Sequence, residues 1–321
     1  MKKGNNILLV AALTLMLIGL ALFVVDRSKD HRDPLSFDVT PCVLTSVDEE
    51  DSFREISVSA NIESISFLPS ADAGCRVEFL EPEKVEPSAR VVNGTLTIGT
   101  TQPGNILEIV VSSLIDTPTI TVYLPADDYD NLKLESDTGS VTLPDDFSFG
   151  SIELESDTGS INCSASARQH IRVKSDTGAI RLSGLSAGEL DLSTDTGAVE
   201  LDSVICAGPI TIREDTGKTM LRNVNCGSLD FHGCTGLLEM EDLLSTGLIA
   251  IEQDTGAVLF ERCDASELRI KTSTGKVVGS LLTEKVFNAK SDTGKVEVPN
   301  TTSGGSCTIT TDTGKIQVTI G

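Results

Sequence analysis

Alternating apolar and polar residues recur through the second half of the chain at a fixed period. Each repeat carries a Thr-Gly pair, and successive glycines are 19 or 20 residues apart. Aspartate precedes the threonine in eight of the ten copies. A fixed period of this length is typical of repeat architectures. The ten glycines are Gly139, Gly159, Gly178, Gly197, Gly217, Gly236, Gly256, Gly275, Gly294 and Gly314.

Aligning the repeats on the glycine separates buried from exposed columns. The columns seven and five residues before the glycine, and two and four after it, hold 38 apolar residues in 40 positions. The columns between them are mostly polar, with Met220, Ala250, Leu259 and Val278 as the apolar exceptions. This alternation predicts two short strands per repeat, each with one buried face. Because the phase of the alternation changes at the glycine, a corner must separate the strands.

Glycine supplies that corner, since it adopts positive φ without penalty and a preceding Asp can close an Asx turn. The predicted fold class is therefore all-β. Residues 132–321 would form a parallel β-solenoid, a β-helix-like rod of about ten coils of 19–20 residues. Its coils would stack through main-chain hydrogen bonds about 4.8 Å apart. One coil alone buries almost nothing, so stability would come from the stack.

Residues 51–131 alternate in the same way but without the period. Runs such as residues 56–60 and 120–124 predict strands. Because repeat arrays need atypical terminal repeats, we expect an irregular β segment that caps and continues the solenoid. A separate sandwich domain is the alternative.

An uncharged run of 19 residues, residues 7–25, follows Lys2 and Lys3. At ~1.5 Å per residue this run is long enough to cross a hydrocarbon core as one transmembrane helix. The two lysines predict that residues 1–6 form a cytoplasmic tail, and the polar, acidic residues 26–50 would be a linker. The predicted localisation is thus the cell membrane, single-pass, with an extracytoplasmic C-terminal domain. A cleaved signal peptide is the alternative.

Charge and cysteine content narrow the chemistry. The formal net charge is −23, so the phosphates of nucleic acid would repel the chain. The eight cysteines form no Cys-x-x-Cys pair, which disfavours a zinc site, and no cofactor is predicted. Cys206 and Cys226 share a column in adjacent coils, within disulfide range. A disulfide between them is one hypothesis, and a role as small buried apolar residues is the other.

The Asp-Thr-Gly copies allow three interpretations. Aspartic proteases carry this motif, but they need two copies that meet at a dyad, and here eight run in register. Stacked aspartates could instead bind calcium, which takes about six to eight oxygens, although the Gly-rich spacing of calcium β-rolls is missing. Corner chemistry explains the whole set best. The weaker calcium candidates are Asp137, Asp157, Asp176, Asp195 and Asp215.

A polysaccharide-acting β-helix is the enzyme alternative. Such sites gather acidic and basic side chains on one sheet face, whereas the exposed column four before the glycine mixes residue types without a cluster. No catalytic residue is predicted. The sequence therefore favours a non-catalytic binding surface or envelope scaffold, with an envelope protein or a glycan as ligand.

The last alternating run, residues 315–320, lies at the C-terminus. An open strand edge is a template for another strand. We therefore expect self-association or partner docking at a C-terminal solenoid edge.

Two adjoining stretches carry a family resemblance. Thr117-Pro-Thr-Ile-Thr-Val-Tyr-Leu-Pro125 leads into Leu132-Lys-Leu-Glu-Ser-Asp-Thr-Gly-Ser-Val141. This junction resembles the bacterial putative-adhesin family of β-strand repeat proteins, a domain of unknown function, over about residues 53–321. The resemblance implies a cell-envelope protein with a solenoid fold, here membrane-anchored. It implies no catalytic residue.

Overall fold

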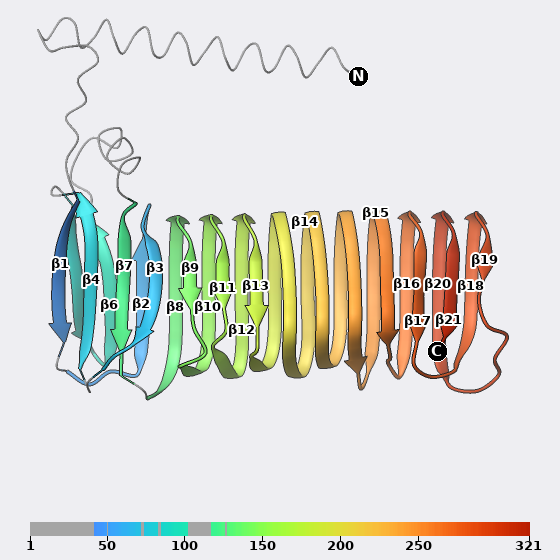
Figure 1. Ribbon diagram of the computed structural model, residues 1–321, viewed down its shortest axis with the longest axis horizontal. Coiled ribbons are helices and arrows are strands. Elements are labelled where there is room, and N and C mark those ends of the chain that lie inside the picture. The colour runs from blue at the N-terminus through green and yellow to red at the C-terminus, as the bar shows by residue number, and fades with distance from the viewer. Residues whose placement is uncertain (1–41, 50, 72–73, 83–84, 102–116, 126) are drawn as a thin grey trace, which may run out of the picture.

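The computed structural model describes residues 42–49, 51–71, 74–82, 85–101, 117–125 and 127–321, which form β-strands joined by short links (Figure 1). The strands before the repeats are β1 (Cys42–Glu49), β2 (Glu55–Ala60), β3 (Ser64–Pro69), β4 (Cys75–Pro82), β5 (Glu86–Val92), β6 (Thr95–Thr101) and β7 (Thr119–Leu124). The first repeats hold β8 (Asp128–Thr138), β9 (Val141–Leu143), β10 (Ser148–Thr158), β11 (Ile161–Cys163), β12 (Ser166–Thr177) and β13 (Ile180–Ser183). The later repeats hold β14 (Ser186–Ser245), β15 (Leu248–Cys263), β16 (Glu267–Thr274), β17 (Val277–Leu281), β18 (Lys285–Thr293), β19 (Val296–Glu297), β20 (Gly305–Thr313) and β21 (Ile316–Ile320).

The predicted fold class, a parallel solenoid preceded by a transmembrane helix, is wrong. The described strands form one 21-stranded sheet that wraps around a single core into a nearly closed, barrel-like tube. The sheet is mixed, because β1–β4, β4–β7 and β5–β6 pair antiparallel. At both ends, strands also pair out of chain order. Alternation predicts which face of a strand is buried, but it does not say which strand lies beside which.

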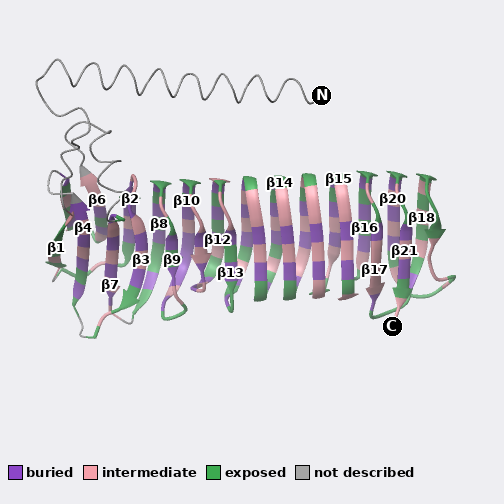
Figure 2. Cartoon of the chain, turned by 45° about the horizontal axis from the view of Figure 1, so that its top comes forward, coloured by how far each residue is buried: buried purple, intermediate pink, exposed green. Residues whose placement is uncertain are grey.

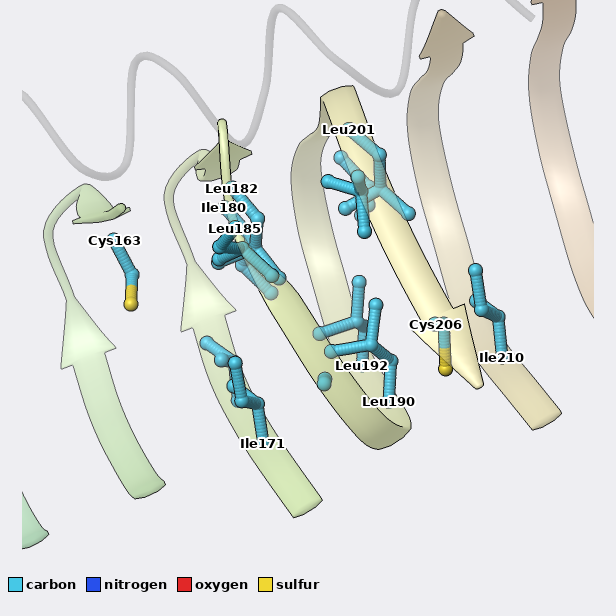
Figure 3. Close-up of a cluster of buried hydrophobic side chains, with 14 of the residues drawn as sticks. Cys163, Ile171, Ile180, Leu182, Leu185, Leu190, Leu192, Leu201, Cys206 and Ile210 are labelled. Carbon is cyan, nitrogen blue, oxygen red and sulfur yellow. The ribbon is translucent and has the colours of Figure 1, made fainter. Parts of the chain in front are cut away.

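The columns that the glycine spacing predicted match the observed register. In the middle of the sheet, neighbouring repeats pair in parallel, with Ile152 beside Ile171 and Ile171 beside Leu190. The apolar columns are almost fully buried along most of the sheet and become partly exposed in the outermost repeat, β18 and β19 (Figure 2). Figure 3 shows one section of this core, where Leu190, Leu192 and Cys206 pack among aliphatic side chains of neighbouring repeats.

Positive φ alone does not explain why glycine recurs at this regular spacing, and the main reason is steric. A Cβ added at Gly178 would lie 1.9 Å from the carbonyl oxygen of Gly159, and one added at Gly197 would lie 1.8 Å from that of Gly178. The same close approach recurs between the other glycines of the column. Each corner therefore packs its backbone directly against the backbone of the neighbouring corner. Four glycines of the column, Gly197, Gly217, Gly236 and Gly275, have no positive φ. Close packing is therefore the constraint that the whole column shares.

At the N-terminal end, the first strands lie between later ones. β2 pairs with β8 on one side and β6 on the other, and β3 pairs with β9 and β7 in the same way. The antiparallel strands β5 and β1 then lie at the two edges of this end. The described residues between 51 and 131 thus share the core of the repeats. Cys42–Glu49, predicted to belong to a linker, instead forms the edge strand β1.

At the C-terminal end, the last repeat lies inside the penultimate one. β20 pairs with β16 and β18, and β21 pairs with β17 and β19. The final strand, β21, is therefore paired on both sides, and the prediction that residues 315–320 form an open edge is wrong. The outermost strands are β18 and β19 (Figure 1). Self-association itself stays a prediction.

A buried ion pair connects the two repeats between which the last repeat, β20 and β21, is inserted. Lys285, the first residue of β18, donates from Nζ to Asp264 Oδ1 at 2.5 Å and also bonds the Thr283 hydroxyl. The Lys285 side chain is 4% exposed. Burial opposes ionisation of Asp264, but hydrogen bonds from Lys285 and Thr283 lower the pKa of its carboxyl. The pair links the outermost repeat to the segment before β16.

The predicted N-terminal features lie outside the described residues. These are the cytoplasmic tail (residues 1–6), the anchor (residues 7–25) and most of the linker (residues 26–50). Within the described part of the chain, no helix is long and apolar enough to cross a membrane. The predicted single-pass membrane localisation is therefore not upheld.

Two carboxyl groups meet in the core of the N-terminal end. Glu63 accepts hydrogen bonds from the backbone N–H groups of Asn61 and Ile62 at 2.6 and 2.9 Å, and from the Thr100 hydroxyl at 2.9 Å. Glu81, 3% exposed, lies beside it. Burial, followed by the charge of Glu63, raises the pKa of Glu81 to about 9. Glu81 is therefore protonated at neutral pH.

Replacing Glu81 by Gln should stabilise the protein at neutral pH. Between pH 4.5, the ordinary pKa, and about 9, the folded protein holds a proton that the unfolded chain releases. The wild-type protein therefore loses up to about 1.4 kcal/mol of stability per pH unit as pH rises through this window. Glu81→Gln removes this loss and keeps a donor toward Glu63, so we expect a gain of about 2–3 kcal/mol at pH 7.

Urea unfolding of both proteins from pH 4.5 to 9 measures this difference. The exposed Glu86→Gln is the matched control, for which we expect no pH-dependent gain. Equal stabilities of wild type and Glu81→Gln across the series would contradict a protonated Glu81.

Candidate functional site

A depression lies on the sheet face that follows the glycines. It is a groove of about 550 Å³ that crosses β14, β15, β17 and β21. Below, "the groove" means this depression. Its lining residues are Met220, Leu221, Arg222, Glu239, Met240, Glu241, Leu259, Phe260, Glu261, Val278, Gly279, Ser280, Gln317 and Thr319.

The floor of the groove carries apolar side chains that point away from the core. Met220, Leu259 and Val278 occupy the outward column three residues after the glycine, and each is only partly buried. In the strand register, Leu259 lies between Glu239 on one side and Val278 on the other. A solvated sheet face normally carries polar residues in such a column. Apolar side chains that gather in a depression with a polar rim are typical of an interaction site.

The shape of the groove depends on a single small residue. Gly279 stands in an inward column that elsewhere holds Leu, Cys, Met, Phe or Val. A Cβ at Gly279 would lie 2.3 Å from the Phe260 ring and equally close to the Phe260 carbonyl oxygen. The Phe260 ring therefore occupies the space that a side chain at Gly279 would need. The depression forms above this pair.

Charged side chains form the rim of the groove. Arg262 donates from Nη2 to Glu241 at 2.8 Å, from Nη2 to Asp242 at 2.7 Å and from Nη1 to Glu261 at 2.6 Å. Hydrogen bonds to Asp242 and Glu241 raise the pKa of Arg262, and the bond from Arg262 lowers that of Asp242. Glu241 and Glu261 are register neighbours, so the guanidinium relieves a repulsion between like charges.

A column of left-handed residues borders the same rim. Ser203, Asn223, Asp242 and Arg262, each six residues after a glycine of the column, have φ between 51° and 58°. Asn and Asp tolerate this conformation, whereas Arg rarely adopts it. Non-glycine residues held there cost on the order of 1 kcal/mol or more and cluster at functional sites. The three ion pairs of Arg262 hold it in place.

The match to a protein family covers this entire region. The model of the family Toastrack DUF4097 matches residues 53–321. The chain belongs to the Toastrack DUF4097 family. This confirms the resemblance expected from the junction of the Leu-Pro and Thr-Gly stretches. The groove lies wholly inside the Toastrack region.

The chain is also similar to several solved structures. A putative adhesin from Bacteroides fragilis is 12% identical, with 86% of this chain and 97% of that chain covered and a TM-score of 0.40. A putative adhesin from Parabacteroides distasonis is also 12% identical, with coverage of 84% and 97% and a TM-score of 0.37. A putative lipid binding protein from Parabacteroides distasonis is 12% identical, with coverage of 86% and 97% and a TM-score of 0.29. Curated proteins include no match to the chain.

The candidate calcium ligands of this Toastrack chain form a row at the corners. Asp137, Asp157, Asp195 and Asp215 are exposed and Asp176 is half-buried. Asp176 lies 3.6 Å from Lys174 Nζ, and Asp215 accepts from the Cys234 thiol at 3.7 Å. The described residues contain no group of three or more His, Cys, Asp or Glu side chains placed to hold a metal ion. The row does not meet the groove.

Cys206 and Cys226 lie in the core as free thiols. Burial raises the pKa of both, and for Cys226 the value is about 11, with Cys206 near enough to contribute. A thiol with a raised pKa is poorly reactive. A disulfide between Cys206 and Cys226 stays a prediction.

Part of the groove can be recognised in the sequence as apolar residues in a column that is otherwise polar. Met220, Leu259 and Val278 are three of the four apolar exceptions in the polar columns. They share one column, three residues after the glycine, which marks one face of the sheet. The neighbourhood of Val278 and Gln317 could not be predicted, because it depends on the insertion of the last repeat between earlier ones.

Proposed function

We propose that this protein is a non-catalytic binding module and that the groove holds a polypeptide segment with both apolar and basic side chains. The observation that carries the proposal is the outward apolar column of Met220, Leu259 and Val278 within a depression of about 550 Å³. Burying such side chains against a partner gains about 1.5–3 kcal/mol each, which makes them natural anchors.

The charge of the whole chain favours a basic partner. The glutamates that line the groove, Glu239, Glu241 and Glu261, are ion-paired with Lys218, Arg222 or Arg262, but the chain carries a net charge of −23. A negative field of this size attracts basic partners and repels acidic ones, which affects the association rate more than the final affinity. The apolar floor provides affinity, and the acidic surroundings select the partner.

Binding of defined peptides to the full chain tests this proposal. The probes are labelled ten-residue peptides of alternating Leu and Lys, alternating Leu and Glu, and alternating Ser and Lys, followed by fluorescence anisotropy. We expect only the Leu/Lys peptide to bind, since the other two lack the basic or the apolar component. Leu259→Glu should weaken this binding at least about tenfold, because it places a charge in the apolar floor.

The matched control is Ile205→Glu, which adds the same charge at an aliphatic residue that is 60% exposed and lies outside the groove. This variant should bind the Leu/Lys peptide as the wild type does. Equal binding of the Ser/Lys peptide would show that only charge is recognised and would contradict the proposal. Binding of a neutral oligosaccharide that Leu259→Glu abolishes would assign the groove to a glycan instead.

A further inference from the structure

The outer strand of the C-terminal end is paired on one side only. Among the described strands, β18 pairs with β20 alone, and β19 pairs with β21 alone. The outward N–H and C=O groups of β18 thus form an open edge, nine residues long. Such an edge is a template for another strand.

Among the C-terminal repeats, this outermost one also carries exposed apolar side chains. Leu282, Val286 and Val296 are 45%, 44% and 37% exposed. Phe287, Ala289 and Val298 belong to core columns but are only partly buried. Their neighbours one repeat inward, in β20 and β21, are at most 3% exposed: Cys307, Ile309, Ile316 and Val318. The core is therefore closed everywhere along the repeats except at this end.

The charges of the edge strand match a second copy of the same strand. Lys290 and Asp292 flank Ser291 and form an ion pair of 2.7 Å on the exposed side of β18. If two β18 strands pair antiparallel about a twofold axis through Ser291, each Lys290 faces the Asp292 of the other copy. Opposite charges that face each other across strands stabilise the pair, and like charges destabilise it.

We propose that two copies of this protein dimerise through their C-terminal ends, with β18 of one copy pairing antiparallel with β18 of the other about Ser291. Both copies use the same surface, so the assembly stops at a dimer. Residues 289–293 of each β18 face each other in this register, so pairing satisfies their open backbone groups. The approach of the two ends also covers Val286, Val296 and the partly exposed core residues. The end face is only a few strands wide, so the association is weak and depends on concentration.

A charge swap on the full chain tests the pairing. Asp292→Lys places Lys290 opposite a lysine and should weaken the dimer at least about tenfold in analytical ultracentrifugation. Lys290→Asp should do the same. The double variant Lys290→Asp/Asp292→Lys restores both the pair within one chain and the pair across the interface, so we expect dimerisation to return to the wild-type level.

Aliphatic substitutions provide the second measurement. Val286→Asp, at the edge, should reduce dimerisation at least about tenfold. Ile205→Asp, which lies away from this end and is more exposed than Val286, at 60% against 44%, should leave dimerisation unchanged. Thermal unfolding of each variant checks that the fold is intact. A protein that stays monomeric at high concentration overturns the proposal. So does a dimer indifferent to Asp292→Lys, or growth beyond two copies, which would indicate association of unlike ends.

Discussion

Gly197→Ala is expected to lose more than about 4 kcal/mol of folding free energy or to fail to form the native sheet. The new methyl group would lie 1.8 Å from the Gly178 carbonyl oxygen, well inside contact distance. Backbone on both sides limits relaxation, because Gly197 and Gly178 belong to paired repeats of one continuous sheet. Losses of this size are exceptional for one methyl group and arise where packed structure cannot relax.

Gly184→Ala separates this steric cause from backbone strain. Gly184 has a φ of +64° and nothing within 4 Å of an added Cβ, so alanine there costs about 1–2 kcal/mol for its left-handed conformation. Gly197 is the reverse case, with a blocked Cβ and no left-handed φ. Urea unfolding monitored by circular dichroism compares the two variants. If Gly197→Ala is no less stable than Gly184→Ala, close packing of the corners is not the reason for the glycine column.

The strand faces and the repeat register could be predicted from the sequence because they depend on local alternation. Leu132, Ile152 and Ile171 are buried and lie side by side, as the alignment on the glycine predicts. Burial of the column three residues before the glycine was not predicted. It holds inward polar side chains, including Ser156, Ser175 and Thr194, each at most 2% exposed.

The order of the terminal repeats could not be predicted from the same pattern. β18 and β20 carry similar alternation, and either would fit beside β16 by its apolar face alone. The order depends on long-range features, such as the Lys285–Asp264 ion pair across the inserted repeat. The groove shares this difficulty, since Gln317 and Thr319 join its lining only through the inserted repeat. Its apolar column, in contrast, was visible in the sequence.

Lys285→Met is expected to cost about 3–5 kcal/mol of folding free energy. Methionine keeps the length and the apolar stem of lysine but leaves Asp264, whose side chain is 21% exposed, without its charged partner. Removing one member of a buried ion pair has a cost of this size, because the remaining charge stays desolvated. Chemical denaturation at pH 7 measures the loss.

The matched control is Lys290→Met, which removes an exposed ion pair in the same strand and should cost at most about 1 kcal/mol. Asp264→Asn in the Lys285→Met background should recover part of the loss, since no buried charge then remains. A pH series adds a second check. The lowered pKa of Asp264 stabilises the folded state above its ordinary value of 3.8, and this contribution is lost as pH falls.

The stability difference between Lys285→Met and wild type should therefore narrow as pH falls, because Asp264 without its lysine partner takes up a proton at a higher pH than Asp264 of the wild type. Hydrogen exchange would locate the effect. Because Lys285 holds the crossing that places β18 outside β20, the variant should exchange faster in β18 and β19, with little change in β10 and β12. If the exchange rate rises equally in all strands of the sheet, the ion pair does not specifically hold β18 outside β20.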